Sequence, residues 1–289
     1  MTIAEIHGKL SPYEHMEDLL TSDVFSTFRY LNPNMGLIPF LKKAVGFIDQ
    51  EVPSFLEDVE EADYIFWPRT SKLNREPDVL VLLTKKDCST VSILIEAKYT
   101  SGKSNLIREE GITEDGKNTI EHLDGDQLAE LYQELQNGNI YIDNRVLRER
   151  FKQSEGNRYL FYATAHYALP KKDLDESFDI LKKRHGKQLC NQFYWVNWMS
   201  VLEVIKEVDE KETWEHAPST RLLLLDLKDL FYRKGLVPYH GFFHLQLNVS
   251  ETAFFFWKEE DQNTGEPFLS GIDVSTIIKK EQPYFWEGE

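Results

Sequence analysis

PDVLVLL, at residues 77–83, and SILIEAK, at residues 92–98, are the two runs that decide the fold. Both are short and rich in Val, Ile and Leu, and the polar turn KKDCS at residues 85–89 separates them. Apolar runs of this length, bounded by turn residues, predict paired β-strands rather than helices. Because side chains alternate between the two faces of a strand, Glu96 and Lys98 point the same way. We expect the hairpin to bring Asp78, at the start of its first strand, beside Glu96.

Two carboxylates and one ammonium would then meet at one end of a sheet. Carboxylate oxygens suit a hard cation such as Mg²⁺ (or Mn²⁺), and Mg²⁺ usually takes only one or two protein carboxylates and keeps several waters. A lysine next to such a cation can orient or activate a bound water for attack on a phosphodiester. The pattern therefore predicts a metal site formed by Asp78 and Glu96, with Lys98 beside it.

The order and spacing Pro-Asp … Glu-x-Lys resemble the PD-(D/E)XK nuclease superfamily, over roughly residues 11–170. The resemblance implies an α/β fold, with a restriction-endonuclease-like mixed β-sheet flanked by helices and the site at one edge of the sheet. It implies one domain, residues 1–289, in which residues 171–289 form a helical and aromatic C-terminal elaboration. It also implies metal-dependent hydrolysis of phosphodiester bonds, of DNA rather than RNA, in restriction, repair or phage defence.

The superfamily pattern further implies an acidic residue on a helix before the strands. Glu14, Glu17 and Asp18 are available there, and Glu14 already suits a capping box with Ser11. We prefer Glu17, with Glu14 second; residues three apart lie on neighbouring parts of one helix face, so both could reach the site.

In related branches of the superfamily a Gln on the helix after the site contacts it, and a Tyr follows four residues later. Gln127 matches the first position, whereas Tyr132 is five residues on, which leaves Tyr132 in doubt. The implied catalytic set is Glu17, Asp78, Glu96, Lys98 and Gln127, and the implied metal ligands are Asp78, Glu96 and Glu17.

The rest of the chain interleaves further strand and helix patterns. Apolar residues at helical spacing predict helices at about 12–32, 39–48, 127–137, 175–184, 200–207 and 220–234, and aromatic or β-branched runs predict strands at 64–67, 159–167 and 193–198. Gly138 and Gly235 are typical of helix ends. No linker or internal repeat is visible, and the interleaving favours one α/β domain.

The chain has 289 residues, enough for a substantial core, and two cysteines, far apart and without metal-site spacing. No secretory apolar region opens the sequence, and no apolar run approaches the roughly 20 residues of a membrane helix. We therefore expect a cytoplasmic protein with reduced cysteines and no membrane partner.

The charge balance counts against a nucleic-acid partner. The formal net charge is −16, from 33 Lys and Arg against 49 Asp and Glu, and a negative field slows approach to DNA. Residues 145–190 are the exception, with eleven basic side chains against six acidic ones. A local basic face there is one hypothesis, and ordinary solvated surface is the other.

Two alternatives to a nuclease stay open. One is a catalytically silent nuclease-like fold that acts as a protein-interaction subunit or homo-oligomer, which suits the net charge best. The other is a nucleotide-binding protein, because Ala97 to Ser104 fits a relaxed phosphate-loop pattern and Leu222 to Asp226 could pass for its acidic partner strand. That second hypothesis requires Lys103 and Ser104 to open a helix.

Overall fold

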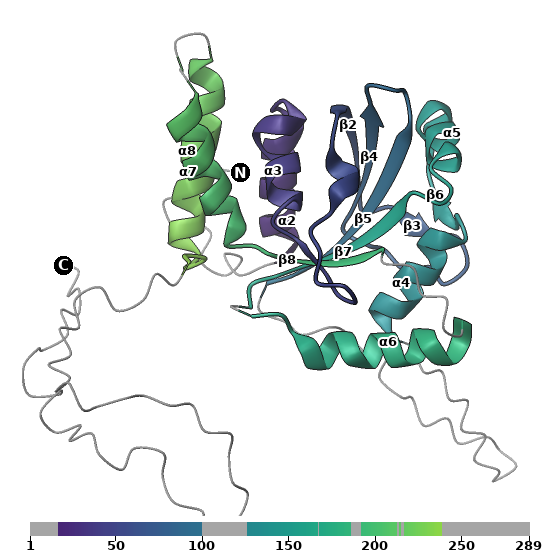
Figure 1. The fold of residues 1–289 in the computed structure, drawn as a ribbon. Helices are drawn as coiled ribbons and strands as arrows, with labels where there is room; N and C mark the ends of the chain where they lie inside the picture. The colour runs from purple at the N-terminus through teal and green to yellow at the C-terminus, as the bar shows by residue number, and fades with distance from the viewer. Residues whose placement is uncertain are drawn as a thin grey trace, which may run out of the picture. The chain divides into compact units, whose positions relative to one another are not determined.

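A computed structural model describes residues 17–99, 126–166, 168–185, 192–212, 214 and 217–238, all within one unit that spans Met1–His240. Predictions that fall elsewhere, including Glu14 and the cap at Ser11, lie outside the described residues, and the single-domain prediction for 1–289 stays a prediction. The elements in chain order (Figure 1) are α2 (Glu17–Arg29), η1 (Pro33–Met35), α3 (Leu37–Leu41), β1 (Val45–Gly46), η2 (Ser54–Leu56), β2 (Val59–Phe66), β3 (Arg69–Thr70), β4 (Val79–Lys85), β5 (Thr90–Lys98), α4 (Gln127–Gln136), β6 (Ile140–Tyr141), α5 (Arg145–Gln153), β7 (Arg158–Thr164), α6 (Lys171–His185), β8 (Phe193–Asn197), α7 (Ser200–Lys211) and α8 (Pro218–Arg233).

The main sheet is mixed and has six strands in the order β1-β8-β7-β5-β4-β2. β4 is antiparallel to both of its neighbours, β2 and β5. β7 is parallel to both of its neighbours, β5 and β8, and β1 is antiparallel to β8. This confirms the predicted α/β class with a mixed sheet flanked by helices. The sheet also extends past residue 170, because β8 is hydrogen-bonded to β7.

The predicted hairpin of β4 and β5 forms the middle of this sheet. Its register pairs Val79 with Ile95 and Thr84 with Thr90, and all nine residues of β5 are buried. A central strand with neighbours on both sides is shielded along its whole length, which explains why its sequence is a nearly continuous apolar run. The polar residues at its end are therefore placed in the interior.

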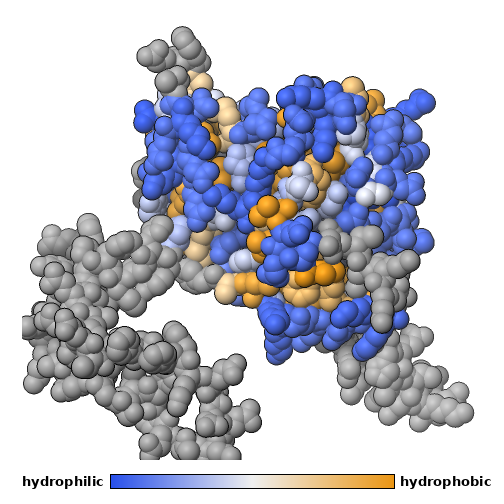
Figure 2. Space-filling view, viewed as in Figure 1, coloured by the Kyte–Doolittle hydropathy of each residue, from blue (hydrophilic) through white to orange (hydrophobic). Residues whose placement is uncertain are grey.

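Helices cover both faces of the sheet (Figure 1), and each face has its own core. Val91, Ile93 and Ile95 of β5 point to the face covered by α2, α3, α7 and α8. Leu94 points to the other face, where it packs with residues of α4 and α6. Figure 2 shows the hydrophilic outer side of α6 and the apolar side chains between this helix and the sheet.

Several predicted boundaries are wrong, and two early segments of the chain differ the most. The helix predicted at 39–48 is the short α3, which ends at Leu41, and Val45–Gly46 is strand β1, paired with Trp195 and Tyr194 of β8. Pairing with a strand about 150 residues away in sequence overrides the local helical spacing. The strand predicted at 64–67 begins earlier, at Val59, and Trp67 lies beyond its end.

Helix α5 and the small β3–β6 sheet were not predicted. Of the residues in α5 only Phe151 is buried, so its apolar signal is weak, and Asn144 caps it by accepting from the amides of Val146 and Leu147. Several basic side chains of 145–190 also serve within the protein: Arg150 pairs with Asp63, and the guanidinium of Arg158 donates to backbone carbonyls. The predicted local basic face loses these members.

The later helices form where they were predicted, although α6 begins four residues before the predicted 175 and α7 ends four residues after the predicted 207. Asp126 caps α4 by accepting from Ala129 N, and α8 ends before Gly235, which has a φ of 69°. Leu222 to Asp226 lie inside α8, so the partner strand required by the phosphate-loop hypothesis is not formed; Lys103 and Ser104 are outside the described residues. Among the described helices, none combines the length and apolar character of a membrane span.

Candidate functional site

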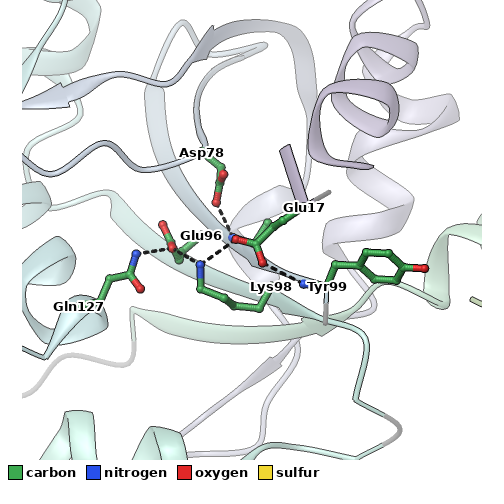
Figure 3. A network of polar contacts seen from close by, with 7 residues as sticks. Glu17, Asp78, Glu96, Lys98, Tyr99 and Gln127 are labelled. Carbon is green, nitrogen blue, oxygen red and sulfur yellow. Dashed lines mark hydrogen bonds and ion pairs between the residues drawn. The ribbon is translucent and has the colours of Figure 1, made fainter. Parts of the chain in front are cut away.

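The predicted site residues come together from separate elements at one edge of the sheet (Figure 3). Glu96 and Lys98 end strand β5, and Asp78 immediately precedes β4. Glu17 and Gln127 are the first residues of α2 and α4 as the structure describes them. Since α2 and α4 belong to opposite faces of the sheet, the end of β5 is approached from both sides.

Lys98 lies at the centre of the cluster. Its Nζ is 2.8 Å from Glu17 Oε1 and 2.9 Å from Glu96 Oε1. The side chain of Lys98 is only 8% exposed, that of Glu96 3%, and that of Glu17 23%. The ammonium is thus a largely buried cation held between two carboxylates, in contrast to the solvated charge pair of a surface strand.

The backbone amides on either side of Lys98 donate hydrogen bonds to one carboxylate oxygen of Asp78 and one of Glu17. Ala97 N donates to Asp78 Oδ2 at 2.7 Å, and Tyr99 N donates to Glu17 Oε2 at 3.1 Å. Both amides belong to the same short segment, so the ends of β4 and α2 are fastened to the end of β5. Tyr99 was not predicted from the sequence, because it contributes a backbone group that leaves no side-chain signal.

Glu96 has one satisfied oxygen and one that lacks a partner. Gln127 Nε2 donates to Glu96 Oε1 at 2.5 Å, and Lys98 donates to the same oxygen. Glu96 Oε2 is buried and has no hydrogen-bond partner in the described part of the protein. A buried acceptor without a donor is destabilising, and a bound cation would satisfy it.

Burial dominates the protonation of the two acids. It raises the pKa of Asp78 to about 6, against the lowering effects of the Ala97 amide and Lys98. Burial, and then the charge of Asp78, raise the pKa of Glu96 to about 8. Burial lowers the pKa of Lys98, but Glu96 and Glu17 outweigh it, so this pKa is raised and the lysine is protonated.

The donor set fits a small hard cation. Glu96 supplies carboxylate oxygens from β5 and Asp78 from the position just before the adjacent β4, and within the described ranges Glu96 Oε2 has no hydrogen-bond partner. No three His, Cys, Asp or Glu side chains within the described ranges are grouped closely enough to hold a metal ion by themselves. The predicted ligands Asp78, Glu96 and Glu17 therefore do not form a three-acid metal cage, whereas Mg²⁺ needs only one or two carboxylates and keeps several waters.

Of the two other candidates, Tyr132 does not join the cluster, and Glu14 is not described by the structure. Tyr132 is buried in the core on the α4 face, where its ring centroid is 6.4 Å from that of Phe193. Glu14 lies outside the described residues, so the choice between it and Glu17 is not tested, although Glu17 does contact Lys98.

Comparisons with family models, with curated proteins and with solved structures each found no match. The fold and the cluster therefore define the chain only as an α/β protein with a mixed six-stranded sheet and a buried acid–lysine–amide site. What the site does is inferred from its chemistry.

Proposed function

We propose that the protein is a Mg²⁺- or Mn²⁺-dependent nuclease that hydrolyses phosphodiester bonds, with DNA as its substrate, on a restriction-endonuclease-like core. The observation that carries the proposal is the convergence of Glu17, Asp78, Glu96 and Lys98 at the end of β5, with Glu96 Oε2 buried and without a donor among the described residues. Carboxylates that hold a metal ion, with a lysine beside it, can carry out phosphodiester hydrolysis. The cytoplasm remains the expected location.

Each residue has a role that follows from its contacts. Asp78 and Glu96 would hold the cation, and Glu17, whose two oxygens accept from Lys98 Nζ and Tyr99 N, would assist through a bound water. The bound cation would polarise a phosphoryl oxygen and lower the pKa of a bound water. Lys98 is protonated and held between Glu96 and Glu17, where it can orient the attacking water and stabilise charge on the phosphate. Gln127 fixes the orientation of Glu96 through their hydrogen bond.

Plasmid nicking in the presence of Mg²⁺ or Mn²⁺ tests this proposal. We expect Asp78→Ala and Lys98→Ala to lose at least about a hundredfold in rate, the scale of a positioned catalytic group. Glu207→Gln is the control, because Glu207 is also a carboxylate paired with a lysine, Lys43, and belongs to α7, which supplies none of the site residues. Equal cleavage by wild type and both site variants would contradict the assignment of Asp78 and Lys98 to a catalytic site.

The alternative, a catalytically silent fold that serves as a protein-interaction subunit, is favoured by one observation, the net charge of −16. It predicts no cleavage with either metal and a folded, stable Asp78→Ala variant. Because that variant removes a buried acid whose pKa is raised to about 6, its stability alone does not separate the two functions, and the cleavage assay decides.

A further inference from the structure

The segment that leads into Asp78 differs in character from the acidic chain around it. Residues 67–77 read WPRTSKLNREP, with three basic residues and one acidic residue. Trp67 is 39% exposed and Leu73 45% exposed, and Lys72 is exposed. The side chain of Arg69 is 69% exposed and forms an exposed ion pair with Glu76 at 3.4 Å, and one side of the Trp67 ring lies near Phe66, with ring centroids 5.6 Å apart. An exposed tryptophan among exposed cations is a combination that packing of the core does not explain.

Trp67 adopts a backbone conformation that bulky residues rarely adopt. Its φ is +47°, in the left-handed region, which is strained for a non-glycine residue. Its amide donates to the carbonyl of Asp78 at 2.8 Å, next to the last β2–β4 pair, Phe66 with Val79. The sheet thus holds an exposed aromatic residue directly across from a residue of the candidate site.

The C-terminal part of the segment is bonded to α4, the helix that carries Gln127. Thr70 N donates to Arg75 O at 2.8 Å and Arg75 N returns a bond to Thr70 Oγ1 at 2.8 Å, which closes the loop. Arg75 also pairs with Glu130 at 2.7 Å, and Lys72 N donates to Glu134 Oε2 at 3.2 Å. Both carboxylates belong to α4. The segment is therefore a structured surface attached to two of the elements that form the site.

We propose that residues 67–77 bind a single-stranded stretch of the nucleic acid on which the site acts. Trp67 stacks on a base, and Arg69 and Lys72 contact the phosphates that lead to Asp78 and Glu96. Stacking on an aromatic side chain needs an unpaired base with a free face, and basic side chains beside it follow the backbone. This inference rests on the proposed nuclease function, and it explains how a chain of net charge −16 offers a local surface to a polyanion.

Fluorescence anisotropy of a labelled single-stranded DNA oligonucleotide, with the full chain in EDTA so that nothing is cleaved, tests the proposal. We expect Trp67→Ala to weaken binding about 5- to 150-fold, the range of one lost base stack, and Trp67→Phe to restore part of it. The double variant Arg69→Ala/Lys72→Ala should reduce the slope of log affinity against log salt by about 1.4. Tyr30→Ala and Lys206→Ala are controls, since both side chains are exposed and lie outside the segment.

The outcomes distinguish failure of the proposed binding role of residues 67–77 from failure of the proposed nuclease function. Wild type that cleaves DNA while the segment variants bind and cleave unchanged would overturn the segment's role and leave the nuclease proposal standing. Binding that depends on Trp67, in a protein that cleaves with neither Mg²⁺ nor Mn²⁺, would overturn the nuclease proposal alone. Absence of oligonucleotide binding, or tighter binding of a blunt duplex unaffected by Trp67→Ala, would also overturn the segment's role.

Discussion

Glu96 is a carboxylate placed where solvation cannot support its charge. Its side chain is 3% exposed, Lys98 and Gln127 both donate to Oε1, and Oε2 has no donor in the described part of the chain. A buried acid in this state is stabilised by a proton or by a cation. The burial of Glu96 is thus better explained by a role in binding a proton or a cation than by a contribution to folding.

This gives a pH dependence for the metal-free protein. The pKa of Glu96 is about 8 when folded and near 4.5 as its ordinary value, so between these pH values the folded state binds the proton more tightly than the unfolded state. Stability should therefore be highest at the acidic end and fall as pH rises towards 8, by up to on the order of 1 kcal/mol per pH unit. Urea unfolding in EDTA at several pH values measures it. In Glu96→Gln this component should vanish; a variant that keeps the wild-type slope would contradict the assignment.

Gln127 allows a test of positioning at the same residue. Gln127→Ala removes a donor to Glu96 Oε1, and loss of a group that orients a metal ligand typically lowers affinity about 10- to 100-fold. Isothermal titration with Mg²⁺ should show this drop, with unfolding midpoints close to those of wild type. Gln133→Ala, on the same helix, is the control. Unchanged Mg²⁺ affinity in Gln127→Ala would remove Gln127 from the site.

At the scale of elements, the sequence predicts best where the signal is local. Two apolar runs predict the β4–β5 hairpin. The cap Asp126 and the terminal Gly138 predict α4, and apolar residues at helical spacing followed by Gly235 predict α8. Each of these signals lies within a few residues of the element it defines. The Asp78, Glu96 and Lys98 part of the site follows directly from the hairpin.

The elements and contacts that sequence reasoning missed depend on distant partners. Strand β1 exists because β8 pairs with it, and α5 is a charged helix with one buried residue, Phe151. The site contacts of Tyr99 and the conformation of Trp67 come from backbone geometry, which no side-chain pattern encodes. Glu17 and Gln127 were found only through the family resemblance, and their contacts with Lys98 and Glu96 could not be derived from spacing.

The cap of α4 connects the element to the site. Asp126 Oδ1 accepts from Ala129 N at 2.8 Å, and Gln127 is the next residue. Asp126→Ala should destabilise the protein by about 1 kcal/mol, the usual effect of a lost N-cap, whereas Asp126→Asn should retain most of the stability. Urea unfolding of the two variants measures the difference. Equal stability of the Ala and Asn variants would show that the cap contributes nothing.

For the molecule as a whole, charge is unbalanced at two levels. The chain carries a net charge of −16, and the candidate site gathers three carboxylates, Glu17, Asp78 and Glu96, around one ammonium. Lys98 neutralises only part of this negative charge. Protons on Asp78 and Glu96, whose pKa values are raised, neutralise more of it. A divalent cation would neutralise the same charge, so its binding and the protonation of the site must compete.

Mg²⁺ should therefore stabilise the folded protein in a pH-dependent way. A ligand at a hundredfold its Kd adds about 2.7 kcal/mol to the free energy of unfolding, so thermal unfolding should shift upward with Mg²⁺ and return with EDTA. Below pH 8 the cation must displace the proton of Glu96, and below about pH 6 that of Asp78 as well, so its affinity should rise with pH through this range. Glu96→Gln should lose the Mg²⁺ shift, while Glu130→Gln, a buried acid outside the site, should keep it. Identical unfolding midpoints in Mg²⁺ and EDTA at pH 8 would mean that the buried acids serve something other than a cation.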